Sequence, residues 1–190
     1  MDKYILGKKL GMTTLYEQKR ALNMTLVECL PNKVSMVRTK ERDGYESVQL
    51  EIAKTSRKMF RKEFRLEAGE TAPEVGAAIE IGAFQVGDRV KVSGLTKARG
   101  FQGVVKRHGF GGAPKSHGRK HDWRKPGSIG SGFPEHVTKG KRMAGRMGGK
   151  RSSSLNLEVV YIDPAQNLIG LRGAVPGVAG RVVEIVTMKK

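Results

Sequence analysis

The sequence has little of what a disulfide-bonded or membrane-spanning protein needs. Cys29 is the only cysteine, which excludes a disulfide framework and a cysteine-based metal cluster. No apolar run approaches the roughly 18 residues that cross a bilayer as a helix. The charged N-terminal segment 1–9 predicts no signal peptide. We therefore expect an intracellular, cytoplasmic protein in which Cys29 is a small core residue.

Acidic residues are scarce in one segment, 96–151. It holds 15 of the 36 Lys and Arg but only two acids, Asp122 and Glu135. All four histidines, the single tryptophan and 13 of the 25 glycines also lie there. A net charge of +18 and a pI near 10.3 predict a polyanionic partner, most commonly nucleic acid. A membrane surface would require a basic helix with an apolar face, which the glycine spacing does not permit.

Aliphatic residues are scarce in the same segment. Between residues 106 and 136, Ile129 is the only Val, Ile, Leu or Met. So little apolar surface cannot offset the entropy of ordering the chain, so this segment should not fold alone. We call 96–151 the basic arm and expect RNA to order it.

The rest of the chain reads as short strands. Apolar residues alternate with polar ones, a period of two that is typical of half-buried strands separated by turns. We therefore predict a mainly β fold, a closed or nearly closed barrel of residues 1–95 and 152–190, with the basic arm inserted between barrel strands. A small irregular or helical lobe is expected near 54–75. The clearest alternating sets are Leu22, Met24 and Leu26; Val48, Leu50 and Ile52; Val90 and Val92; and Leu155, Leu157, Val159 and Tyr161.

The cations of the basic arm are separated by small residues, which lets the backbone approach a phosphate while each cation reaches a different one. Arginine offers bidentate donors and lysine a point charge, and Trp or His rings stack on unpaired bases. The candidate RNA-binding residues are Lys97, Arg99, Lys106, Arg107, His108, Lys115, His117, Arg119, Lys120, His121, Trp123, Arg124, Lys125, Ser128, Lys139, Lys141, Arg142, Arg146, Lys150 and Arg151.

The histidines do not predict a metal site. His117 and His121 have the spacing of one helical face, but Gly118 lies between them and no cysteine or nearby glutamate completes a ligand set. The neighbouring cations would repel a metal ion. We expect neither metal nor cofactor.

Enzyme motifs are incomplete. The segment 145–151 is similar to a P-loop, but Ala144 replaces its first glycine and Arg151 its Ser or Thr. Two GxxG matches lack the flanking strand and helix of a nucleotide or KH site. A metal-dependent nuclease would need clustered carboxylates. We expect no catalysis, and two alternatives stay open: an RNA-modifying enzyme that uses the histidines, and a non-ribosomal RNA chaperone.

Six blocks then occur in order along nearly the whole chain: Leu6–Thr13 (LGKKLGMT), Phe84–Gly94 (FQVGDRVKVSG), Gly100–Gly112 (GFQGVVKRHGFGG), Pro126–Gly130 (PGSIG), Lys139–Gly148 (KGKRMAGRMG) and Gly173–Gly177 (GAVPG). Together they resemble the third large-subunit ribosomal protein family in its bacterial form. The length also resembles that of the bacterial members.

The resemblance implies a translation-factor-like β-barrel and a structural, non-catalytic role in the large ribosomal subunit. It implies binding near the 3′ end of large-subunit rRNA to nucleate assembly, beside the fourteenth and nineteenth large-subunit proteins. The arm would extend toward the peptidyl transferase centre, with strands at Val104–His108 and Lys139–Met147. Its tip would comprise Gly127, Ile129, Gly130, Ser131, Gly132 and Phe133 within 126–133. Some relatives have a methylated glutamine where this chain has Ser131.

Overall fold

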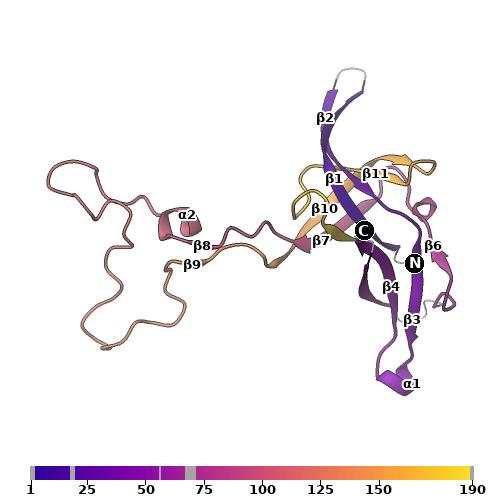
Figure 1. Cartoon of the computed structure of the whole chain (residues 1–190), viewed down its shortest axis with the longest axis horizontal. Helices are drawn as coiled ribbons and strands as arrows, with labels where there is room; N and C mark the ends of the chain where they lie inside the picture. Colours follow the sequence, from indigo (N-terminus) through magenta and orange to yellow (C-terminus); the bar gives the residue numbers. More distant parts are fainter. Residues whose placement is uncertain (1–2, 18–19, 56, 67–71, 189–190) are drawn as a thin grey trace. The chain divides into compact units, whose positions relative to one another are not determined.

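The computed structural model describes residues 3–17, 20–55, 57–66 and 72–188 (Figure 1). The chain forms two compact units: Met1–Thr96 with Arg151–Lys190, and Lys97–Lys150. We call the first the barrel unit and the second the inserted unit. The inserted unit is one residue shorter than the basic arm at each end, so Thr96 and Arg151 belong to the barrel unit.

Six antiparallel strands of the barrel unit close into a barrel in the order β1-β12-β7-β10-β11-β2, with β2 paired back to β1. The predicted mainly β fold is confirmed. The inserted unit lies in the chain between β7 and β10, which pair directly with each other. The barrel strands are β1 (Tyr4–Glu17), β2 (Arg20–Glu28), β7 (Arg89–Leu95), β10 (Arg151–Asp163), β11 (Leu168–Arg172) and β12 (Val182–Thr187).

All six barrel strands contribute apolar side chains to the barrel interior. Val90 and Val92 of β7 are fully buried, as their alternation predicted. In β1, Ile5 joins this interior cluster whereas Leu6 packs on the opposite face. Since successive strand residues face opposite ways, β1 separates two cores.

A second sheet, in the order β5-β4-β3-β6, supplies the other core. The predicted face of Val48, Leu50 and Ile52 is confirmed, because all three are buried in this core. Tyr4 stacks on Phe64 there, with ring centroids 5.1 Å apart. The strands are β3 (Asn32–Arg38), β4 (Ser47–Thr55), β5 (Lys58–Arg65) and β6 (Ala78–Ile79).

The predicted irregular or helical lobe near 54–75 is wrong at the described residues 54–55, which end β4, and 58–65, whereas residues 66 and 72–75 belong to no helix or strand. Residues 58–65 form β5, which pairs with β4 along its whole length. Phe60 and Phe64 face the core, and a spacing of four residues places two side chains on one face of a strand as well as of a helix. The spacing therefore did not identify a strand, and the cations between the two rings obscured the alternation of apolar and polar residues. Ser56 and residues 67–71 of the predicted lobe lie outside the described residues.

The predicted face of β2 also differs. Met24 of the predicted set is buried, but Leu22 and Leu26 are only partly buried, whereas Thr25 and Val27 of the other face are fully buried. Closure of the barrel turns the face with Val27 inward, and Thr25 Oγ1 donates to the carbonyl of Gly173 at 2.6 Å. In β10 a register shift between Ser154 and Leu157 breaks the expected alternation.

Cys29 is a core residue, as predicted. Burial, followed by the charge of Glu28, raises the pKa of its thiol to about 12. The thiol therefore stays protonated and packs as a small apolar group.

The helical segments are short: α1 (Lys40–Asp43), the 3-10 turn Ile81–Ala83 and α2 (Val104–His108). Across the described ranges, none of the helices has the length and apolarity required to cross a membrane.

Candidate nucleic-acid interface

The two ends of the inserted unit run side by side. β8 (Phe101–Gln102) pairs with β9 (Gly145–Arg146). Next to this ladder the Arg99 N–H donates to the Met147 carbonyl and the Met147 N–H to the Gly100 carbonyl, each at 2.9 Å. Backbone hydrogen bonds, rather than an apolar core, therefore hold the base of the unit together.

Gly148 allows the two ends to approach closely. A Cβ at this position would lie 2.0 Å from the Lys97 carbonyl oxygen, and its φ of +73° is one that other residues rarely adopt. At this position the glycine serves an approach between two chain segments, whereas the sequence predicted an approach to phosphate.

The predicted strand at Val104–His108 is wrong, because these residues form helix α2. Gly103 and Gly109 flank the helix, and Gly109 adopts the left-handed conformation that ends helices. Val104 is buried, and Arg107 and His108, three and four residues later, share its face.

Arg107 and His108 are consequently turned toward the chain itself. Arg107 Nη1 donates to the Met143 carbonyl at 2.5 Å, and His108 Nε2 lies 3.1 Å from the same oxygen. Both side chains are half-buried. We assign them to positioning the 143–147 segment.

The second predicted strand, Lys139–Met147, is mostly wrong as well. Only Gly145 and Arg146 are in a strand, and the Lys141 N–H closes a turn onto the Thr138 carbonyl at 3.2 Å. Glycines and exposed cations leave this segment without the apolar alternation that would hold a longer ladder.

Residues 113–123 form a loop closed at its base. The Ala113 N–H donates to the Trp123 carbonyl at 3.2 Å. Gly112 (φ +75°) makes room, because a Cβ there would lie 2.2 Å from the same oxygen. Lys115 Nζ lies 5.5 Å from the Trp123 ring centroid and the Arg124 guanidinium 6.0 Å, both within cation–π range. The sequence did not anticipate this closure, which needs the three-dimensional fold.

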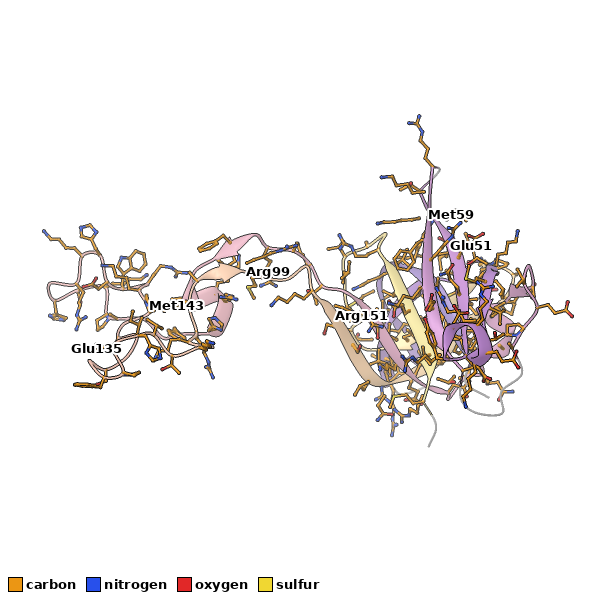
Figure 2. All side chains as sticks on the ribbon, turned by 90° about the horizontal axis from the view of Figure 1, so that it is seen from below. Glu51, Met59, Arg99, Glu135, Met143 and Arg151 are labelled. Carbon is orange, nitrogen blue, oxygen red and sulfur yellow. The ribbon has the colours of Figure 1, made fainter. Side chains whose placement is uncertain are left out.

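Exposure is continuous along most of the inserted unit. Every residue of this unit is described; each one from Pro114 to Arg142 is exposed, and Val104 is the only one that is buried. Figure 2 shows the side chains spreading outward around the labelled Glu135 and Met143. The inserted unit therefore has no aliphatic core of its own beyond Val104.

The predicted site residues fall into two groups. Arg107 and His108 are half-buried, and Arg151 lies at the start of β10, where it pairs with Glu184 of the barrel unit. The other predicted rRNA-binding side chains are all exposed within the inserted unit: Lys97, Arg99, Lys106, Lys115, His117, Arg119, Lys120, His121, Trp123, Arg124, Lys125, Ser128, Lys139, Lys141, Arg142, Arg146 and Lys150.

Charge within the inserted unit is strongly unbalanced. Fourteen Lys and Arg accompany two acids. Asp122 is engaged by Lys125 at 2.7 Å, a hydrogen bond that lowers the pKa of the Asp122 carboxyl below its ordinary value. Two carboxylates cannot neutralise fourteen cations, so the excess charge is available to an external polyanion.

The predicted tip is exposed throughout. The Phe133 side chain is 85% exposed and that of Ile129 43% exposed. Ser128 Oγ donates to the Gly130 carbonyl at 3.1 Å, an internal contact that shapes the PGSIG turn. Both apolar side chains are therefore accessible from solvent.

The histidines are dispersed. His136 Nδ1 lies 2.8 Å from the Pro134 carbonyl, His108 contacts Met143, and His117 and His121 are exposed. Among the described residues, His, Cys, Asp and Glu form no group of three or more that could hold a metal ion.

Sequence reasoning missed a pocket in the barrel unit. It has a volume of about 530 Å³ and is lined by parts of β4 and β5, the ends of β7 and β10 that lead to and from the inserted unit, residues 178–182 and Glu184. Lys54, Lys62 and Arg181 are among its lining residues. Four segments of the chain build it, so no local sequence signal marks it.

Fold and charge thus define a class: a basic, mainly β protein with a cationic unit inserted between two paired barrel strands. The chain belongs to the ribosomal protein L3 family, whose model matches residues 18–168. It is 41% identical to the large ribosomal subunit protein uL3 of Halorhodospira halophila, over 93% of this chain and 93% of that protein. Identity to the protein of the same name from Streptococcus pyogenes serotype M1 is also 41%, over 97% of this chain and 96% of that protein. These relatives are bacterial, as the sequence blocks predicted.

Proposed function

We propose that this chain is a structural, non-catalytic rRNA-binding component of the large ribosomal subunit. The observation that carries the proposal is the uninterrupted exposure of Pro114–Arg142 within a unit of fourteen Lys and Arg and two acids. Such a segment has the charge and accessibility to bind along a phosphate backbone. The names of its relatives, large ribosomal subunit proteins, support the same partner.

Binding would proceed by charge neutralisation where rRNA segments pack together. Exposed cations on both ends of the inserted unit would each contact a different phosphate and release its counterions. Trp123 and His121 would offer rings to unpaired bases, and Phe133 an apolar contact. The chemistry of peptide bond formation would belong to the rRNA.

The finer assignment rests on the sequence blocks. The barrel would be translation-factor-like. The protein would bind near the 3′ end of large-subunit rRNA and help nucleate subunit assembly in the cytoplasm. Residues 126–133 would reach toward the peptidyl transferase centre, and the fourteenth and nineteenth large-subunit proteins would be neighbours. The exposed PGSIG segment supports this tip.

A triple substitution separates RNA binding from folding. Lys141→Ala, Arg142→Ala and Arg146→Ala together should weaken binding to an rRNA fragment and reduce the slope of log affinity against log salt by about 3. All three side chains are exposed in the inserted unit, so the melting temperature of the barrel unit should barely change. Filter binding at several salt concentrations and thermal melting followed by circular dichroism measure the two effects.

The matched control removes three exposed cations from the barrel unit: Lys33→Ala, Lys40→Ala and Lys58→Ala. Both triple variants lower the net charge by the same amount. Equal weakening of RNA binding by the two would therefore show that affinity depends only on the net charge of the chain. A collapse of melting in the first triple variant would contradict the assignment of those cations to the RNA interface.

A further inference from the structure

We propose that the barrel unit contains a second RNA-binding site, a pocket that takes one unstacked guanosine nucleotide. This inference rests on the proposed RNA ligand but concerns a different unit from the cationic insertion. The pocket volume, about 530 Å³, lies in the range of roughly 300–1,000 Å³ typical of small-ligand sites. All of its lining residues belong to the barrel unit.

The pocket walls include apolar side chains suited to the faces of a base. Phe60 of β5 contributes an aromatic ring that is only partly buried. Leu95 at the end of β7 is 45% exposed and Val178 is half-buried. Flat bases that leave a helical stack gain stability against aromatic and aliphatic side chains.

A buried carboxylate also lines the pocket. Glu184 of β12 is only 8% exposed. Arg151 Nη2 donates to its Oε2, while Lys62 Nζ lies 3.8 Å from Oε1, beyond hydrogen-bond distance. Within the described part of the chain no hydrogen bond reaches Oε1, so this oxygen retains acceptor capacity.

Guanine matches that acceptor better than the other bases do. Its N1–H and N2–H₂ groups are adjacent donors that reach the two oxygens of one carboxylate. Adenine and cytosine present one exocyclic amino group each, and uracil a single ring N–H. Since each carboxylate oxygen accepts more than one hydrogen bond, the contact from Arg151 does not block this pairing.

Cations at the pocket suit the phosphate of the same nucleotide. Lys54 is exposed and Arg181 half-buried, and neither has an acidic partner among the residues that the structure describes. An acidic peptide would also attract these cations, but its carboxylates would face Glu184. A nucleotide combines an anionic phosphate with a donor-bearing base, so it fits both halves of the pocket.

The test uses the full chain and three fluorescent RNA hairpins of one sequence: fully paired, with one bulged guanosine, and with one bulged adenosine. Anisotropy titrations should give a bulged-guanosine affinity about tenfold above those of the other two hairpins, the size of one bidentate base contact. Equal affinities would overturn the pocket but leave the proposed function standing. No binding to any hairpin would overturn both.

Two variants locate the effect. Glu184→Gln should abolish the guanosine preference while binding to the paired hairpin stays unchanged. Because that change leaves Arg151 without its partner, the double variant Lys54→Ala with Arg181→Ala serves as a second probe; it removes only side chains outside the cores. It should weaken the bulged-guanosine complex more than the paired one.

The triple variant of the inserted unit supplies the orthogonal control. It should weaken all three complexes alike and keep the guanosine preference. Displacement of the bulged guanosine by a hexaglutamate peptide at equal concentration would instead assign the pocket to an acidic protein partner and overturn the proposal.

Discussion

Affinity for large-subunit rRNA fragments is expected to fall by about 10³ to 10⁵ between roughly 50 and 200 mM salt. This range follows if about six to ten cations of the inserted unit contact phosphates and release counterions. Fourteen Lys and Arg lie in that unit, so the number of contacts is available without the barrel unit. Filter binding with a fragment from the 3′ end of large-subunit rRNA over a salt series measures the slope.

The matched barrel-unit triple variant should keep the full slope, because its exposed lysines lie outside the inserted unit. A response to salt that is nearly flat would contradict phosphate contact as the main source of affinity. So would a slope unchanged by the triple substitution at Lys141, Arg142 and Arg146.

The second large effect concerns the barrel unit. Asn32→Ala is expected to lower the free energy of unfolding by about 3 kcal/mol, because it leaves buried backbone groups unpaired at roughly 1–3 kcal/mol each. Asn32 is 0% exposed. Its Oδ1 accepts from the Leu6 N–H at 2.7 Å, and its Nδ2 donates to the carbonyls of Leu6 at 3.0 Å and Leu30 at 2.6 Å. Urea unfolding followed by circular dichroism measures the loss.

Asn23→Ala is the matched control. Asn23 is an exposed residue of β2 whose side chain accepts one hydrogen bond, from Thr14 Oγ1 at 3.0 Å. Its loss should change the unfolding free energy by less than about 0.5 kcal/mol. Similar losses at the two asparagines would contradict the role of Asn32 in joining β1 to the start of β3.

Strand prediction succeeded where one face alone is apolar. In β4, Val48, Leu50 and Ile52 share one core and the intervening side chains are polar, so composition and burial agree. In β2 both faces carry apolar residues, and only closure of the barrel decides that Val27 points inward. In β5 the closely spaced cations concealed a strand whose partner, β4, supplies the hydrogen bonds.

For the candidate site, composition indicated the exposure of the segment but not its local structure. Scarcity of aliphatic residues correctly indicated an exposed unit, because burial requires apolar surface. The family resemblance implied a strand at Val104–His108, yet flanking glycines and contacts from Arg107 and His108 to Met143 hold a helix there. The barrel-unit pocket was invisible, since its residues come together only on folding.

Co-sedimentation with ribosomal particles tests the central claim most directly. Tagged full chain expressed in bacterial cells should migrate with large subunits on a sucrose gradient and remain there after a high-salt wash, because assembled rRNA would enclose the inserted unit. The triple variant at Lys141, Arg142 and Arg146 should be incorporated less. Recovery of the intact chain only at the top of the gradient, or its release by the wash while other large-subunit proteins stay bound, would contradict a structural role in the large subunit.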